Sequence, residues 1–365
     1  MNHETDGLPP ERDPALNDGG AVERDSKVDD AGAPKQEQAL AAAEARPATE
    51  STLRKIFVGK DGLRAGWSLL IFIALCAGMI FCVNAIGRKL HMAGPQGGGQ
   101  FSASPGFLFI AEAVPFLGVL LITWIMSRIE RRPNPVYGFG DRRMVAHFLA
   151  GLGWGVSCLS LLVLTLWKSG LLVIDGRLLL GDDILRYGGV WLLAFLLVGL
   201  FEEYLTRGYL QYTLTRGLAG VYGWAFKTRH SAALGFWTSA AILSVLFGLG
   251  HGNNPGESPI GLLSAGLVAM VFCLSLWRTG SLWWAIGFHA AWDWAQSFLY
   301  GVADSGLMVE HHLLATHPVG RPILSGGTTG PEGSVFVLAV IVIVTLIILF
   351  TLPREHYGSG VRAFE

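Results

Sequence analysis

Residues 188–210 read GGVWLLAFLLVGLFEEYLTRGYL, and this stretch combines a membrane-like run with a cluster of charges. The first 13 residues are as apolar as a helix that crosses a bilayer. They end in two adjacent carboxylates, Glu202 and Glu203, and Arg207 follows four residues after the second. An ionisable side chain at bilayer depth costs several kcal/mol unless it is paired or faces water. The stretch therefore predicts a membrane helix that carries a functional site.

The whole chain has the composition of a polytopic membrane protein. Of its 365 residues 51% are hydrophobic and only 15% are charged, and the mean hydropathy is +0.45. About eight stretches approach the roughly 20 apolar residues that the hydrocarbon core demands. They are residues 66–86, 107–126, 146–167, 190–210, 234–250, 260–276, 282–299 and 335–352. Because backbone groups in lipid need internal partners, we expect an all-α, polytopic helix bundle.

The charge divides the chain into parts. Residues 1–50 hold 12 acidic and 5 basic side chains and no aromatic residue. Such a segment cannot bury enough apolar area to offset its chain entropy, so we predict a disordered acidic tail. We expect the membrane helix bundle over residues 51–357, with a catalytic core at about 188–299, and a C-terminal tail at 358–365.

Lysine and arginine in the short loops predict the orientation of the helices. With the N-terminus placed inside, the inner segments contain 15 of these residues and the outer segments contain 6. Basic residues favour the cytoplasmic side. We therefore expect both termini to be cytoplasmic.

The two glutamates of the quoted stretch have different surroundings on a helix. Glu203 and Arg207 are four apart, so they share a face and can neutralise each other. Glu202 is rotated by about 100° from Glu203 and lacks that partner. A desolvated carboxylate can act as a general base near neutral pH. The plainer alternative is a charged cap where the helix leaves the membrane.

Two further apolar stretches carry ionisable groups. FGLGH, at 247–251, ends in His251, which alone is more often a polar helix terminus than a catalyst. HAAWD, at 289–293, places His289 and Asp293 on one helical face, and the plain alternative is an Asp–His bond that locks the bundle. Glu112 and the histidines of EHHLLATH, at 310–317, are weaker candidates.

Together the three stretches resemble the CAAX prenyl protease and bacteriocin-processing (CPBP) family, also called type II CAAX or Abi proteases. EEYLTR fits EExxxR, FGLGH fits FxxxH and HAAWD fits HxxxN/D, in the family's order and on separate predicted helices. The resemblance covers roughly residues 190–299. It implies an intramembrane endopeptidase that cleaves a membrane-associated protein or peptide.

The resemblance also implies roles for these residues. Glu202 would be the general base for the attacking water, which His251 would help to hold, and His289 with Asp293 would form the oxyanion-stabilising pair. Glu203, Arg207 and Phe247 would give structural support. An ionised aspartate repels an oxyanion, so Asp293 would be protonated, orient His289 or join a metal site.

Strict alternation of eight full spans would keep these groups apart. It puts His251 near the outer end of its helix and His289 nearer the inner side. We expect some segments to span partially, with HGNNPGESP, at 251–259, dipping into the bundle to line a cavity.

Two other functions stay open at the level of the sequence. The same residues, Glu202, His251 and His289, could hold a divalent metal in a hydrolase, although the glutamate mechanism calls for no cofactor. The chain could instead be a non-enzymatic scaffold or transporter in which these residues relay protons. We expect the lipid bilayer and a peptide substrate as partners and no nucleic acid. The family's abundance in bacteria favours an inner-membrane location.

Overall fold

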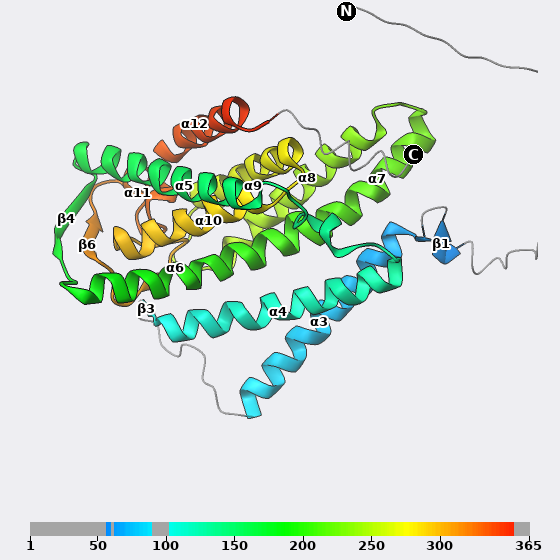
Figure 1. Ribbon diagram of the computed structural model, residues 1–365. Helices are drawn as coiled ribbons and strands as arrows, with labels where there is room; N and C mark the ends of the chain where they lie inside the picture. The colour runs from blue at the N-terminus through cyan, green and yellow to red at the C-terminus, as the bar shows by residue number, and fades with distance from the viewer. Residues whose placement is uncertain (1–55, 60–61, 90–101, 354–365) are drawn as a thin grey trace, which may run out of the picture. The chain divides into compact units, whose positions relative to one another are not determined.

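The structure is a computed structural model that describes residues 56–59, 62–89 and 102–353. The predicted acidic tail at 1–50 and the C-terminal tail at 358–365 lie outside the described residues. The remainder is a bundle of α-helices with three two-stranded β-pairs at its edges (Figure 1). The expectation of a polytopic helix bundle is therefore confirmed.

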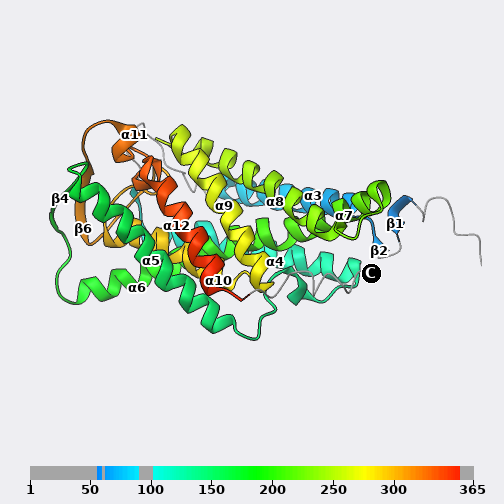
Figure 2. The same ribbon diagram turned by 90° about the horizontal axis from the view of Figure 1, so that it is seen from above.

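Seven long helices make up most of the bundle. They are α3 (Ala65–Lys89), α4 (Pro105–Glu130), α5 (Met144–Lys168), α6 (Asp182–Glu203), α7 (Gln211–Phe226), α8 (Ser231–Gly250) and α9 (Pro259–Thr279). Two further helices of the described residues follow, α10 (Trp283–Trp294), of 12 residues, and α12 (Phe336–Thr351), of 16 residues like α7. Seen from above, α12 lies beside α5 and α9 (Figure 2).

The number of spans is smaller than the sequence suggested. Within the described residues, six helical segments are long and apolar enough to cross a membrane, against the expected eight or so. The expected seventh segment is α10, of 12 residues, continued without a break by the π-helix η4 (Ala295–Leu299), of 5 residues. The eighth is α12, whose 16 residues extend about 24 Å, less than the hydrocarbon thickness. Both segments are bundle helices, as expected, but neither is among the six.

The quoted stretch lies inside a much longer helix than expected. α6 passes without interruption through a π-helix, η2 (Tyr204–Leu210), into α7. The continuous helix covers Asp182–Phe226, 45 residues. At 1.5 Å per residue it is roughly 68 Å long, about twice the thickness of the hydrocarbon core. Glu202 and Glu203 therefore lie in the middle of this helix.

The short helix α10 lies between α5 and α6 at the centre of the bundle (Figure 1). Small residues make this close approach possible. A Cβ atom on Gly151 or Gly155 of α5 would overlap the backbone of α10, and one on Gly287 of α10 would overlap the Phe148 carbonyl oxygen. On the other side, Gly199 of α6 packs against the α10 backbone near Ile286. The side chains of α10 are thus held at fixed depth and rotation.

The segment between η4 (Ala295–Leu299) and α12 is an ordered cover, which we call the strap (residues 300–335). β5 (Met308–Val309) pairs in parallel with β3 (Ser102–Ala103), and β6 (Leu314–Pro318) pairs antiparallel with β4 (Leu172–Arg177). The short helices α11 (Pro322–Ser325) and η5 (Pro331–Gly333) complete it. Near the N-terminal end of the described residues, β1 (Val58–Gly59) and β2 (Gly62–Leu63) form an antiparallel pair. Elsewhere, η1 (Asn134–Tyr137) and η3 (His251–Asn253) are single turns.

The packing of α5 against α10 predicts opposite effects for two neighbouring glycines. Gly151→Ala forces a methyl group into the Trp284 carbonyl and should lower the free energy of unfolding by about 1–3 kcal/mol. Gly153→Ala, on the exposed face of the same helix, meets nothing within 4 Å and should raise it by about 0.5–1 kcal/mol. Thermal unfolding in detergent measures both. Equal effects of the two variants would refute the close packing.

Candidate active site

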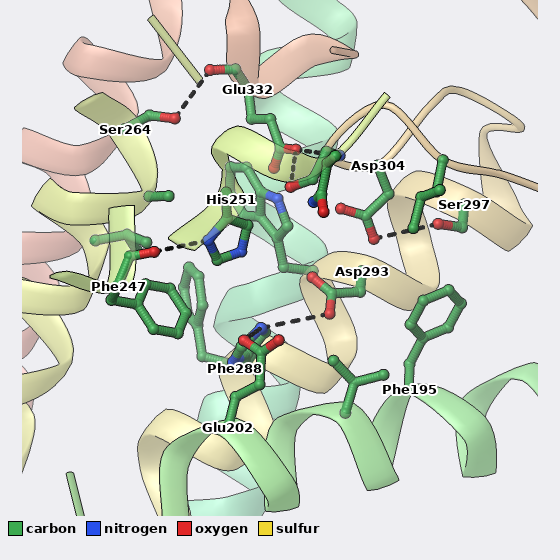
Figure 3. Close-up of a pocket in the computed structure, with 18 of the residues that line it drawn as sticks. Phe195, Glu202, Phe247, His251, Ser264, Phe288, Asp293, Ser297, Asp304 and Glu332 are labelled. Atoms are coloured by element: carbon green, nitrogen blue, oxygen red, sulfur yellow. Dashed lines mark hydrogen bonds and ion pairs between the residues drawn. The ribbon is translucent and has the colours of Figure 1, made fainter. Parts of the chain in front are cut away.

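One cavity of about 280 Å³ collects most of the residues that the sequence singled out (Figure 3). Glu202 comes from α6, Phe247 from the end of α8, and His289 and Asp293 from α10. His251, the first residue of η3, faces the same space. Glu112 of α4, the weaker candidate, also lines it. The structure thus brings residues from four separate parts of the bundle to one cavity that is large enough for several waters.

Glu203 and Arg207 are beside this cavity and not in its lining. The Arg207 guanidinium donates to Glu203 Oε1 over 2.8 Å, as the spacing of four residues predicted. Glu203 is fully buried and Arg207 is 4% exposed. A buried carboxylate needs such a counter-charge, because desolvation of an isolated one costs several kcal/mol. This pair supports the interpretation of Glu203 and Arg207 as structural residues.

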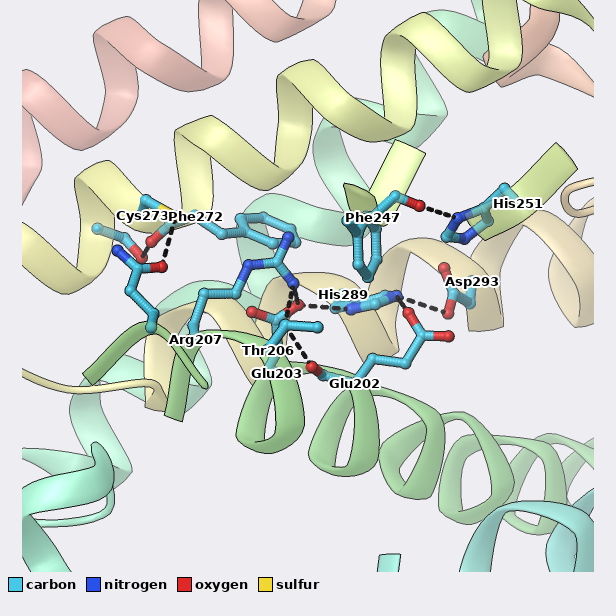
Figure 4. Close-up of polar contacts among 12 residues, drawn as sticks. Glu202, Glu203, Thr206, Arg207, Phe247, His251, Phe272, Cys273, His289 and Asp293 are labelled. Atoms are coloured by element: carbon cyan, nitrogen blue, oxygen red, sulfur yellow. Dashed lines mark hydrogen bonds and ion pairs between the residues drawn. The ribbon is translucent and has the colours of Figure 1, made fainter. Parts of the chain in front are cut away.

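His289 joins that pair to the cavity (Figure 4). Its Nδ1 lies 3.0 Å from Glu203 Oε1, while its Nε2 lies 3.5 Å from Asp293 Oδ2 and 3.7 Å from Glu202 Oε2. Both ring nitrogens therefore face carboxylates, an arrangement that suits an imidazolium donating from each nitrogen. The contact between Glu203 and His289 is one that sequence reasoning missed, because it links two helices and no spacing within either helix reveals it.

Phe247 explains why an aromatic residue precedes His251 by one turn. Its ring lies under the Arg207 guanidinium, 4.4 Å from ring centroid to Cζ, and 4.8 Å from the His251 ring. The Phe247 carbonyl accepts a hydrogen bond from His251 Nδ1 over 2.8 Å. With Nδ1 as the donor, Nε2 is left as the acceptor. Phe247 thus connects the charged pair to the second histidine through cation–π and ring contacts.

The strap supplies polar cavity residues that none of the sequence motifs predicted. Asp304 and Glu332 line the side opposite Glu202, and Ser305 is also in the lining (Figure 3). Glu332 Oε1 accepts from the Ser305 hydroxyl over 2.8 Å, and Asp304 Oδ2 accepts from Ser297 over 3.3 Å. In the sequence these are isolated acids in an apparent loop. Only the antiparallel pairing of β6 with β4 and the parallel pairing of β5 with β3 bring them over the site.

Residues 251–259 form a rim of the cavity: His251 and Asn254 line it, although no residue of the stretch is buried. The strap lies against this rim, and the hydroxyl groups of Thr328 and Thr329 donate to the Gly256 carbonyl. The loop histidines remain outside: His312 Nδ1 contacts the Leu314 carbonyl, and His317 pairs with Asp175.

A metal centre would require several ligating side chains to face one point. Within residues 56–59, 62–89 and 102–353, no group of three or more His, Cys, Asp or Glu is arranged to hold a metal ion. Glu202, His251 and His289 share the cavity, but as placed they do not converge on one point in the way that a zinc site requires.

The different surroundings of the two adjacent glutamates predict different effects on stability. Glu203→Gln leaves Arg207 buried without its counter-charge and should lower the free energy of unfolding by about 3–5 kcal/mol. The Glu202 side chain is 27% exposed, so Glu202→Gln should change it by less than about 1 kcal/mol. Thermal unfolding of the two variants in the same detergent compares them. A more destabilising Glu202 variant would reverse the proposed assignment of roles.

The strap acids predict that stability falls as the pH rises. Burial, together with the nearby carboxylates of Asp293 and Glu332, raises the pKa of Asp304 well above its usual 3.8, and the His289 ring opposes this. Burial also raises the pKa of Glu332, which the bonds from Ser305 oppose. When the pH exceeds the pKa that such a carboxyl has in the unfolded chain, the unfolded state releases the proton and the folded state still holds it. The folded state therefore becomes less stable relative to the unfolded state as the pH rises.

Asp304→Asn should therefore flatten the pH dependence of folding. We expect the thermal midpoint of the unmodified protein to fall more steeply between about pH 4 and about pH 7 than that of the variant. Parallel curves would show that Asp304 does not hold a proton in the folded state.

The comparisons with known proteins agree with this geometry. Residues 185–295 match the family model described as Type II CAAX prenyl endopeptidase Rce1-like. No curated protein and no solved structure matches the chain. The matched segment begins in α6, ends at the first residue of η4 and contains all three motifs, although it is less than a third of the chain. Residues 185–295 are therefore similar to the Rce1-like type II CAAX prenyl endopeptidases.

Proposed function

We propose that this protein is an intramembrane endopeptidase that hydrolyses a membrane-associated protein or peptide with a water activated by Glu202. The observation that carries the proposal is the convergence of Glu202, His251, His289 and Asp293 on one cavity, inside a segment that is similar to a protease family. Peptide hydrolysis needs a held water, a base and donors for the oxyanion. These four side chains can supply all of them.

The reaction can be written with the protein's own groups. Glu202 takes a proton from the water as the water oxygen bonds to the carbonyl carbon, while the Nε2 acceptor of His251 helps to hold that water. The proton on His289 Nε2 stabilises the oxyanion that forms. When the intermediate collapses, the C–N bond breaks and the amine leaves with the proton from Glu202. The enzyme returns to its starting state without needing a metal.

Asp293 and Glu203 fit a role in holding His289. Asp293 Oδ2 lies 3.5 Å from Nε2 and Glu203 Oε1 lies 3.0 Å from Nδ1. Two carboxylates on opposite nitrogens fix the ring and favour its charged form, which is the form that donates to an oxyanion. Of the alternatives for Asp293, this geometry supports an orienting partner of His289.

The cavity suits a substrate that has both an apolar part and a peptide backbone. Apolar residues from three helices line the cavity, including Phe195 and Val198 of α6, Val268 of α9 and Val340 of α12. Polar groups line it as well, among them Glu202, Asp293 and Asp304 (Figure 3). We propose a membrane-associated peptide or protein as the substrate, in contact with the bilayer that surrounds the bundle. The six membrane-capable helices and the excess of basic residues in the inner segments support a bacterial inner-membrane protein with both termini in the cytoplasm.

Cleavage of a library of membrane peptides by purified protein tests the proposal. Glu202→Gln should lower kcat by at least about 10³-fold, because the water loses its base. Glu310→Gln, which changes an exposed carboxylate outside the cavity, should leave kcat within about twofold. Activity of the unmodified protein should persist in a chelator.

Other outcomes point to the alternative functions. Equal cleavage by the Glu202→Gln variant and the unmodified protein would remove Glu202 as the base. Loss of activity in chelator, restored by a divalent metal, would replace the glutamate mechanism with a metal-dependent hydrolase. Absence of cleavage of every peptide by every variant would favour a scaffold or a transporter.

A further inference from the structure

In the described part of the chain η4 is a π-helix that follows α10, and η2 is a second π-helix next to the site. The helix η2 inserts an extra residue per turn between α6, which carries Glu202 and Glu203, and α7. π-turns are rare because their hydrogen-bond geometry and packing are poorer than those of an α-helix, and they are frequent at functional sites. Such a turn persists when contacts on both of its sides require a rotation that a regular helix cannot provide.

On the side of the active site, the charged pair fixes the helix. Arg207, within η2, donates to Glu203 and lies over the rings of Phe247 from α8 and Phe272 from α9. Glu203 in turn contacts His289 of α10. These contacts fix the rotation of the last turn of α6 relative to α8, α9 and α10.

On the side of η2 that faces away from the active site, Tyr209, two residues after Arg207, fixes the same turn. Tyr209 is fully buried, and its hydroxyl donates to Glu130 Oε1 over 2.9 Å. Its ring stacks on Phe72 of α3 with centroids 4.0 Å apart. Glu130, the last residue of α4, is held by Arg132, with Nε at 3.6 Å, and by Arg216, with a terminal nitrogen at 3.8 Å. Tyr209 thus binds η2 to α3 and α4, away from the cavity.

We propose that the hydrogen bond from Tyr209 to Glu130 is a positioning contact that sets the rotation of η2 and so places Glu202 and Glu203 against His289. The inference rests on the proposed function, since it assigns a catalytic consequence to this contact. Without the bond, η2 can relax toward a regular α-helix. Each residue of register corresponds to a rotation of about 100°, which would turn both glutamates away from α10.

Two tyrosines around Glu130 give a matched test. Tyr209→Phe removes the hydroxyl but keeps the ring that stacks on Phe72. Tyr137→Phe also removes a fully buried hydroxyl that faces Glu130, but this one is at 3.5 Å and comes from η1. We expect Tyr209→Phe to lower kcat by about tenfold or more with KM within about twofold, because a displaced base slows the chemical step. Tyr137→Phe should change kcat by less than about twofold, because a contact of that length is weak.

A second readout does not depend on proteolysis. In protein labelled with ¹⁵N-histidine, the ring signals of His289 are identified by their loss in His289→Gln. Tyr209→Phe should shift these signals and Tyr137→Phe should not, because only the first moves Glu203 and Glu202 relative to the ring. The thermal midpoints of the two variants show whether a loss of kcat or a shifted His289 signal comes from a loss of stability.

The outcomes separate the positioning role from the proposed function. Equal losses of kcat in both variants, or unchanged His289 signals in Tyr209→Phe, would overturn the inference and leave the Glu130 cluster as packing. If the unmodified protein cleaves no peptide, the proposed function fails. The His289 signals then still decide whether Tyr209 controls the placement of the glutamates.

Discussion

The site depends on one buried charge, the Glu203 carboxylate at the end of α6. It has no access to solvent, so its negative charge must be compensated inside the protein. Arg207 compensates it along the same helix and His289 does so from α10. The first contact requires the helix to continue past Glu203, and the second requires α10 to lie one side-chain length away. The first requirement is met because α6 continues into η2. The second is met because glycines on α5 and α6 admit the backbone of α10.

Once His289 is held from one side by Glu203, its other ring nitrogen faces the cavity between Asp293 and Glu202. Phe247 connects His251 to the same group of residues. Its ring contacts the Arg207 guanidinium, and its carbonyl accepts a hydrogen bond from His251 Nδ1. The three motifs are therefore a single connected network and not three independent contributions. The strap closes this network from the far side with Asp304 and Glu332, in a part of the chain beyond the family match.

The helical bundle and the residues of the site could be predicted because their signals are local. Runs of apolar residues mark the helices, and carboxylates or histidines within such runs are too costly to be incidental. The spacing of four residues predicted the pairing of Glu203 with Arg207, which the structure contains. Contacts between distant segments could not be predicted from the sequence, such as that between Glu203 and His289 and the cover that the strap forms over the cavity. The π-turn of η2 could not be predicted either. The sequence also overestimated the number of helices that could cross a membrane, because a buried core helix and a membrane span have similar composition.

The central claim is that Glu202 and His289 act on opposite sides of one scissile peptide bond. The most direct measurement is an experimental structure of the Glu202→Gln variant with an uncleaved substrate peptide bound. We predict a peptide carbonyl oxygen within hydrogen-bonding distance of His289 Nε2, with its carbon facing the side chain at position 202 and space for a water between them. A peptide bound outside the cavity, or one whose carbonyl lies beyond reach of His289, would contradict the account.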